Sequence, residues 1–298
     1  MEFGKLQQVD SVQFLLPEIS SSLTRTEGTP NLFVGATGYN MKDWVGSWYP
    51  SSTKTNGHLL AYGKQFNTIE HNTTHYRIPD SETIHRWIAE TPSDFRFCPK
   101  IPQVISHARD LGVHNTELRL FWERMTALSP RLGVCFLQLP PHFEPRNLPV
   151  LSRFLDTWPS HLPLAVEVRH PLFFATGPEQ DRYFELLTER QTGAVVTDVA
   201  GRRDVCHGHL TAPFLLVRFV GNSLHPSDFT RIDDWASQLK KWVQAGASSV
   251  YFFTHEPDNL LAPELAQYTV EKFRKVFPES KLRGPEPYRP PGEQGALF

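Results

Sequence analysis

The chain has 298 residues, of which 40% are hydrophobic, and this suits a soluble globular protein with one barrel-sized domain or two smaller ones. The 30 Lys and Arg residues nearly balance the 32 Asp and Glu residues, so the net charge of −2 argues against a general attraction to nucleic acid or anionic lipid. No apolar stretch approaches the ~20 residues that cross a bilayer, which excludes a membrane-spanning helix.

Residues 1–30 show no clear periodicity, and we interpret them as an N-terminal extension in a loop conformation, packed on the floor of the domain. Eight short apolar runs follow, and each predicts a strand. They are Leu32–Gly35, Thr68–Glu70, Phe95–Cys98, Val134–Leu139, Leu164–Val168, Ala194–Thr197, Phe214–Phe219 and Val250–Phe253.

Helical spacing of apolar residues separates these runs, most clearly at 118–128, 151–158, 183–187 and 232–243. Weaker helical patterns lie at 59–66, 83–90 and 263–276. Residues 278–298 form a proline-rich tail with little to bury. Residues 31–277 therefore form the folded unit, and their length is close to the ~250 residues of a (β/α)₈ barrel.

Strands that alternate with helices predict a parallel sheet. An open doubly wound sheet is the alternative, but the first strand is followed by Gly35-Ala36-Thr37-Gly38-Tyr39, which lacks the G-x-G-x-x-G phosphate turn. Eight strands also favour closure. We therefore predict a single-domain α/β protein of the TIM type, with its active site at the mouth formed by the carboxyl ends of the strands.

Polar residues at the strand ends identify the candidate site. After the second run, strand alternation places Glu70 and Asn72 on one face, and Tyr76 and Arg77 follow in the same dense segment. After the fifth run, Glu167 and Arg169 are two residues apart and share a face. This pair is either a structural ion pair or a functional one, in which Arg169 holds an anion and Glu167 acts as a base or metal ligand.

The remaining candidates are single residues at the other strand ends. Polar and charged residues in or beside apolar strands need partners or a ligand, because unpaired polar groups are costly to bury. They are Lys100, Gln138, Asp198, Arg218 and His255, with His107 on the loop after Lys100. This mixture of acids and bases indicates a pocket for a small polar, anionic molecule beside acid–base groups.

A divalent metal bound by Glu70, Glu167, Asp198 and His255 is an alternative, although the basic residues compete for the carboxylates and no H-x-H or H-E-x-x-H motif is present. We expect no cofactor otherwise. The three cysteines, Cys98, Cys135 and Cys206, show no paired spacing, which favours a reducing compartment and a cytoplasmic location.

The ordered series of segments resembles the YecE-like family of TIM-type barrels, catalogued as a domain of unknown function. The segments that carry the resemblance include Lys42-Asp43-Trp44, Phe66 to Arg77, Phe95 to Lys100, Phe136 to Pro141, Glu167 to Pro171, Asp198 and Val217-Arg218. The resemblance covers about residues 31–277 and implies the barrel and the location of the site, but it supplies no reaction.

Two functional hypotheses follow. In the first, the protein is an enzyme, of hydrolase or isomerase type, acting on a sugar- or nucleotide-phosphate-like substrate. Lys100, Arg169 and Arg218 hold the anion, the candidate acids and histidines move protons, and Asn72, Gln138 and Tyr76 orient the substrate. In the second, the protein is a non-catalytic binder of a metabolite or single-stranded nucleic acid, with stacking on Trp44, Trp48, Tyr49 and Tyr76. The near-neutral net charge counts against nucleic acid.

Overall fold

The structure is a computed structural model and describes residues 4–25 and 28–290. Eight parallel strands form its sheet, in the spatial order β4-β3-β2-β10-β9-β7-β6-β5. They are β2 (Asn31–Ala36), β3 (Thr68–His71), β4 (Arg96–Pro99), β5 (Cys135–Gln138), β6 (Leu164–Glu167), β7 (Gly193–Asp198), β9 (Phe214–Val220) and β10 (Ser249–His255). Each predicted run overlaps one of these strands, with bounds that differ by one or two residues at most ends.

Short contacts between β4 and β5 close the sheet. Parallel bridges join Phe97 to Leu132 and Lys100 to Phe136, and the Ile101 N–H donates to the Phe136 carbonyl at 2.9 Å. The predicted α/β fold, a TIM-type barrel, is confirmed.

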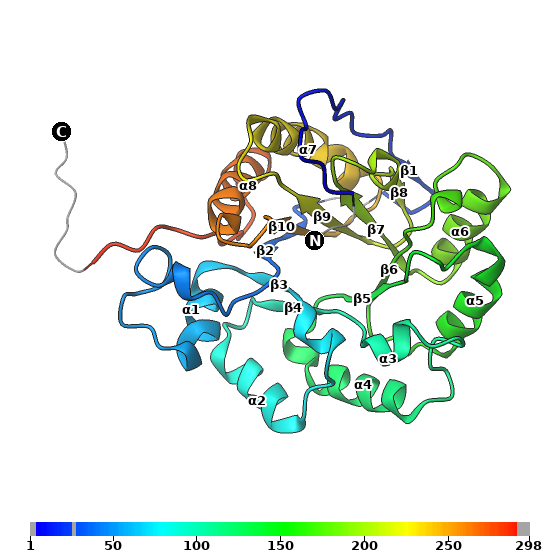
Figure 1. Cartoon of the computed structure of the whole chain (residues 1–298), viewed down its shortest axis with the longest axis horizontal. Helices are drawn as coiled ribbons and strands as arrows, with labels where there is room; N and C mark the ends of the chain where they lie inside the picture. The colour runs from blue at the N-terminus through cyan, green and yellow to red at the C-terminus, as the bar shows by residue number, and fades with distance from the viewer. Residues whose placement is uncertain (1–3, 26–27, 291–298) are drawn as a thin grey trace.

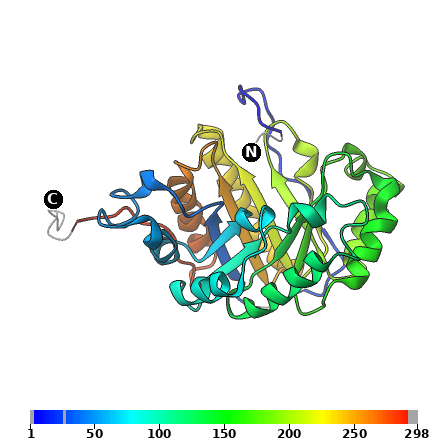
Figure 2. The ribbon, with the colours of Figure 1, turned by 60° about the horizontal axis from the view of Figure 1, so that its bottom comes forward.

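Helices follow the strands and cover the outside of the barrel (Figures 1 and 2). All of the predicted helical patterns are confirmed, although their bounds differ by a few residues. The helices are α1 (His58–Gln65), α2 (Ser81–Glu90), α3 (Gln103–Ser106), α4 (Thr116–Ala127), α5 (Leu148–Thr157), α6 (Pro178–Glu189), α7 (Pro226–Gln244) and α8 (Ala262–Val276).

The two faces of each strand have different neighbours. One face packs against the helices in the large outer core, and the other fills the inside of the barrel. The inner cluster includes Cys98, Phe136, Ala165, Val195, Leu216 and Phe253. Because side chains alternate along a strand, these residues fix which positions nearer the carboxyl ends also point inward. Those positions include 100, 138, 167, 197, 218 and 255, and position 70 also points inward because it pairs in register with Cys98.

The N-terminal segment runs along the outside of the barrel from the mouth to the floor. Near the mouth, the Gly201 N–H donates to the Gly4 carbonyl at 2.6 Å. Further along, β1 (Ser20–Ser21) pairs with β8 (His209–Leu210), and the Ser21 hydroxyl donates to the Ala245 carbonyl at 2.8 Å. The segment therefore reaches the floor only at its end and contains one short strand that the sequence did not predict.

Residues 278–290 pack against the barrel, which differs from the expectation of a tail with little to bury. Leu282 is buried, and the Arg283 guanidinium bonds the Phe66 carbonyl and, at 2.6 Å, Asp94. The Tyr288 N–H reaches the Ser47 carbonyl at 2.7 Å, so this stretch runs past α1 in Figure 1. Residues 291–298 of the predicted tail lie outside the described residues.

The helices and the three cysteines bear on two expectations from the sequence. Among the described residues, no helix has both the length and the apolar character needed to cross a membrane. Cys98, Cys135 and Cys206 are all buried free thiols.

Candidate active site at the barrel mouth

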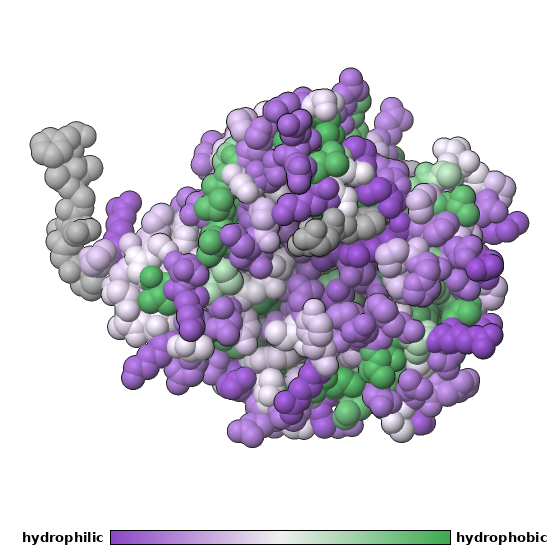
Figure 3. Space-filling model, in the orientation of Figure 1, coloured by the Kyte–Doolittle hydropathy of each residue, from purple (hydrophilic) through white to green (hydrophobic). Residues whose placement is uncertain are grey.

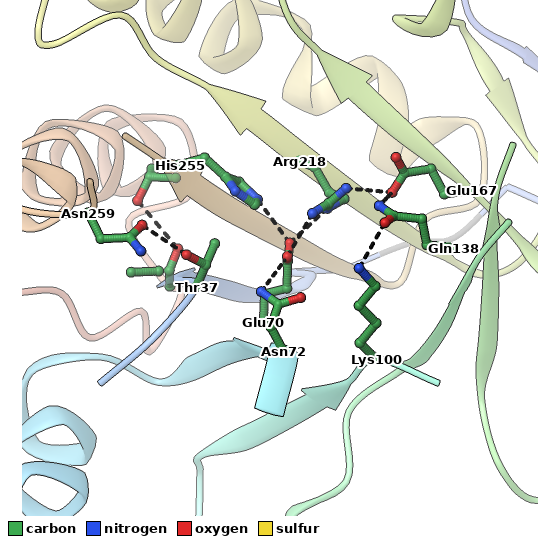
Figure 4. Close-up of polar contacts among 12 residues, drawn as sticks. Thr37, Glu70, Asn72, Lys100, Gln138, Glu167, Arg218, His255 and Asn259 are labelled. Atoms are coloured by element: carbon green, nitrogen blue, oxygen red, sulfur yellow. Dashed lines mark hydrogen bonds and ion pairs between the residues drawn. The ribbon is translucent and has the colours of Figure 1, made fainter. Parts of the chain in front are cut away.

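Arg218 lies at the centre of the mouth and joins two carboxylates from different strands (Figure 4). Its Nε and Nη2 donate to the two oxygens of Glu70, each at 2.8 Å. Its Nη1 donates to Glu167 Oε2 at 2.5 Å. The guanidinium is thereby paired with both acids, and a planar fork suits this two-sided arrangement.

Two further groups hold Glu70. The ring of His255 approaches Glu70 Oε2 with its Nε2 at 2.9 Å, and the Asn72 amide donates to Oε1 at 2.9 Å. Because a carboxylate only accepts hydrogen bonds, the proton of His255 lies on Nε2. The predicted common face of Glu70 and Asn72 is confirmed.

A chain of hydrogen bonds leads from Glu167 to Lys100. The Gln138 amide donates to Glu167 Oε2 at 2.9 Å, and its carbonyl oxygen accepts from Lys100 Nζ at 2.8 Å. Arg169 forms an ion pair with Glu167 Oε1 at 3.3 Å, so the predicted pairing of these two residues is present. Lys100, Gln138, Glu167 and Arg169 therefore form one connected group.

The electrostatics favour ionised acids. Burial alone would raise the pKa of Glu70, but Arg218 and His255 outweigh it and hold this pKa well below its ordinary value. Burial also opposes ionisation of Glu167, and Arg218 and Arg169 still keep its pKa lowered. The pKa of His255 is lowered, because its burial outweighs the attraction of Glu70. At neutral pH, therefore, both acids are charged and His255 is neutral.

Lys100 responds differently. Burial, and then the nearby Arg218 charge, lower its pKa to about 8, although Glu70 and Glu167 act in the opposite direction. This group consequently titrates close to physiological pH, which neither carboxylate of the mouth does.

The hydrogen-bonded network around Arg218 has a buried layer and a layer that is partly exposed to solvent. The Glu70, Glu167 and Arg218 side chains are at most 3% exposed. The Arg169 side chain is 17% exposed, and Asn72, Lys100 and Gln138 are also partly exposed. Figure 3 shows mostly hydrophilic residues around the centre of this face. A molecule entering the mouth would meet the partly exposed layer first.

Asp198 does not belong to this network, and its predicted place at the mouth is wrong. Its carboxylate accepts from Trp235 Nε1 of α7 at 2.8 Å and pairs with Arg203 and Arg231. Strand alternation from Val195, which lies inside the barrel, sends Asp198 outward toward the helices. Burial opposes ionisation of Asp198, but Arg231 and Arg203 keep its pKa lowered.

Thr197 takes the inward position instead, and the sequence analysis missed it. It pairs in register with Arg218 on the neighbouring strand. Its hydroxyl is buried and has no hydrogen-bond partner among the described residues. The sequence does not distinguish Thr197 from Asp198 as the inward residue, because both end a strand that is buried on both faces.

Three predicted residues lie at or outside the rim. His107 is exposed, and burial with the charge of Lys100 lowers its pKa, which places it near the lysine. Tyr76 is 82% exposed, and its ring contacts His75 edge-on. The Arg77 side chain is exposed. The structure brings neither Tyr76 nor Arg77 into hydrogen bonding with the network.

Trp44 is wrongly predicted as a binding residue. It is 1% exposed, its Nε1 donates to the Leu260 carbonyl at 3.0 Å, and its ring packs against Tyr62 and Phe66 in the outer core. Trp48 and Tyr49 are also buried. The surface for base stacking that these rings were expected to form is therefore absent, and only Tyr76 of the four is exposed.

The possible metal site can also be compared with the geometry. Within residues 4–25 and 28–290, no group of three or more His, Cys, Asp or Glu residues is arranged to hold a metal ion. Of the four proposed ligands, Glu70 and Glu167 bind Arg218, and Asp198 faces α7.

Fold and site together define a TIM-type barrel whose mouth contains an arginine bound between two buried carboxylates. The family model described as "Protein of unknown function DUF72" matches residues 33–288. The chain belongs to this family, and the resemblance noted from the sequence is confirmed.

Individual relatives agree with this assignment. The chain is 38% identical over 239 residues to UPF0759 protein YecE of Escherichia coli (strain K12), covering 74% of this chain and 87% of that protein. It is 27% identical over 151 residues to UPF0759 protein YunF of Bacillus subtilis (strain 168), covering 48% of this chain and 52% of that protein.

Solved structures show the same fold. A DUF72 family protein from Enterococcus faecalis V583 is similar with a TM-score of 0.66 and 20% identity, over 87% of this chain and 98% of that one. A DUF72 family protein from Thermotoga maritima MSB8 is similar with a TM-score of 0.61 and 21% identity, over 83% of this chain and 98% of that one.

Proposed function

We propose that this protein is an enzyme that binds a small, polar, anionic molecule at the barrel mouth and acts on it by acid–base chemistry, with Lys100 as the group that exchanges protons. The observation that supports this most directly is the arrangement of charges. Both carboxylates of the mouth are bound to Arg218, whereas Lys100 forms no ion pair with any described residue and bonds the neutral amide of Gln138.

The charge balance favours an anion. The two acids Glu70 and Glu167 face three cationic groups, Arg218, Arg169 and Lys100, which leaves one positive charge when the lysine is protonated. A singly charged carboxylate or phosphate ester would neutralise it. In a partly buried mouth this attraction is stronger than in water, because less solvent screens it.

In this proposal Arg169 and Lys100 bind the anion, because their side chains are partly exposed, and Asn72 and Gln138 orient hydroxyl groups. The sequence analysis proposed that Arg218 holds the anion, and the structure leads us to a different role for it. Its three hydrogen bonds already go to the carboxylates, so it positions Glu70 and Glu167 rather than the substrate. The same bonds make these acids weak proton acceptors, since their pKa values are lowered.

Binding of inorganic phosphate, followed by NMR detection of turnover across a panel of sugar phosphates and nucleotides, tests the proposal. We expect Arg169→Ala and Lys100→Met each to weaken phosphate binding by roughly 10- to 100-fold, the loss of a hydrogen bond to a charged group. Arg146→Ala and Lys275→Met are matched controls, because both side chains are exposed and paired with neighbours on the outside of the barrel.

Equal phosphate affinity in all four variants would count against an anion site at the mouth. Anion binding that depends on Arg169 and Lys100, but without turnover of any compound in the panel, would instead favour the non-catalytic binder.

A further inference from the structure

The chemical state of Lys100 goes beyond what an anion site requires. A lysine that only holds an anion is usually kept charged by an acidic neighbour, and two acids are present in this mouth. Both, however, are bound to Arg218, and Glu167 is also paired with Arg169. The amine of Lys100 donates to the carbonyl oxygen of Gln138 at 2.8 Å. A neutral amine can also donate this hydrogen bond, because it still carries N–H groups.

The surroundings of Lys100 favour the neutral amine. Burial and the Arg218 charge bring its pKa to about 8, so roughly a tenth of the molecules carry a free amine at pH 7, against roughly 0.03% for a lysine at its ordinary value. Desolvation next to other cations is a known way to activate a lysine as a nucleophile. The charged or titratable groups that act on Lys100, or on which it acts, are Glu70, Glu167, Arg169, Arg218, His75 and His107.

We infer that Lys100 is a catalytic nucleophile that condenses with the carbonyl carbon of an anionic aldehyde or ketone to form an imine. This inference rests on the proposed function and names its substrate class: a small oxo-acid, or a phosphorylated carbonyl compound. The anion would lie on Arg169, the partly exposed cation beside the network, and the carbonyl group would lie on Lys100.

The step balances without any redox partner. The neutral amine of Lys100 forms a bond to the carbonyl carbon, and the proton lost from nitrogen is taken up by the former carbonyl oxygen. The resulting carbinolamine takes up from solvent the proton that the Lys100 ammonium released when it became neutral, and it loses its hydroxyl group as water, which leaves a protonated imine. One ammonium and one carbonyl group thereby become one protonated imine and one water.

The mouth of the barrel can accommodate both the starting ammonium of Lys100 and the protonated imine that replaces it. A protonated imine has the same charge as the ammonium it replaces, and its N–H can keep donating to Gln138 Oε1, so the bonds to Glu167 and Arg218 need not change. The positive imine withdraws electrons from the carbon next to it, which is how lysine imines promote acid–base chemistry on carbonyl compounds. Glu70, His255 and Asn72 remain connected on the opposite side of Arg218.

Reduction of the imine with sodium borohydride, followed by mass spectrometry of the intact protein and of its peptides, tests the inference. The probes are pyruvate and dihydroxyacetone phosphate, with uncharged acetone for comparison. We expect a single adduct on Lys100 with the charged probes, at least ten times less with acetone, and a yield that rises with pH through about 8. Lys275→Met should keep the adduct.

Two variants separate this inference from the proposed function. Lys100→Arg keeps the charge and should bind phosphate but form no adduct, whereas Lys100→Met should lose both. Circular dichroism and melting temperature establish that each variant is folded. If the wild type binds phosphate at the mouth but neither charged probe is trapped on Lys100, the imine is refuted and the anion site stands. If phosphate binding is insensitive to Lys100 and Arg169, the proposed function fails as well.

Discussion

Replacing Arg218 by Met removes the guanidinium group that forms ion pairs with both Glu70 and Glu167. Both carboxylates are buried, and the guanidinium makes three hydrogen bonds to them. Removing one partner of a buried ion pair costs about 3–5 kcal/mol, because the other charge stays buried without compensation. At ~2–4 °C per kcal/mol for a chain approaching this size, Arg218→Met should melt roughly 6–20 °C below the wild type at pH 7.

The pH dependence of this loss follows from the pKa shifts. In the wild type, the pKa values of Glu70 and Glu167 are lowered on folding. Their contribution to stability is therefore present above the unfolded value of ~4.3 and is lost only as pH falls further, through the folded values. Between pH 7 and pH 5 the wild type should change little on their account.

In Arg218→Met, the strongest attraction that keeps both carboxyl groups ionised is lost, so we expect burial to raise both carboxyl pKa values above those of the unfolded chain. The folded variant then binds protons more readily than the unfolded one, so its stability rises as pH falls. The gap between variant and wild type should shrink between pH 7 and pH 5. Urea denaturation at the two pH values measures this difference in the free energy of unfolding.

Neutralising the acids provides the control. The triple variant Glu70→Gln, Glu167→Gln, Arg218→Met has no buried charge left at this point and should be more stable than Arg218→Met at pH 7. A cost below about 1 kcal/mol for Arg218→Met, or a gap that widens toward pH 5, would refute the view that Arg218 holds two ionised acids.

Strand alternation explains why much of the site was predictable. Glu70, Lys100, Gln138, Glu167 and Arg218 are polar residues near the ends of apolar strands, and each lies on the inward face of the barrel. Once the fold is a closed parallel barrel, such residues must meet at its mouth. The resemblance to a known family pointed to the same segments.

The prediction for Asp198 was wrong because strand alternation alone does not show which face of a strand points inward. Both faces of a strand in this barrel are buried, so the run Val195-Val196-Thr197-Asp198 does not show which face is inward. Asp198 was chosen because carboxylates carry more chemistry than hydroxyls, but Thr197 occupies the inward position. The prediction for Trp44 was wrong for another reason: it lies in a single 3-10 turn, Lys42–Trp44, which is too short for a period to indicate whether a ring is exposed or packed.

The ion pairs that Arg218 forms with Glu70 and Glu167 across the barrel could not be predicted from the sequence either. Arg218 is separated from Glu70 by 148 residues and from Glu167 by 51. The apolar strand around Arg218 indicated that its side chain needs an acid or a ligand, but not that both acids would bind it. This pairing transfers the expected proton exchange from the carboxylates to Lys100.

Two further substitutions, at Thr197 and Asp198, test the opposite faces of β7, and a third, at Thr74, serves as a comparison. Thr197→Val removes a buried hydroxyl without a described partner, so the free energy of unfolding in urea should stay within about 1 kcal/mol of the wild type or rise. Thr74→Val, whose hydroxyl donates to the His71 and Lys100 carbonyls, should lose about 1–3 kcal/mol. Asp198→Asn keeps the shape of the side chain but leaves two partly or fully buried arginines, Arg203 and Arg231, without its charge. We expect it to destabilise the protein by about 2–4 kcal/mol while phosphate affinity stays unchanged, because Asp198 faces α7 and not the mouth. A variant with native stability and at least tenfold weaker phosphate binding would place Asp198 in the site after all.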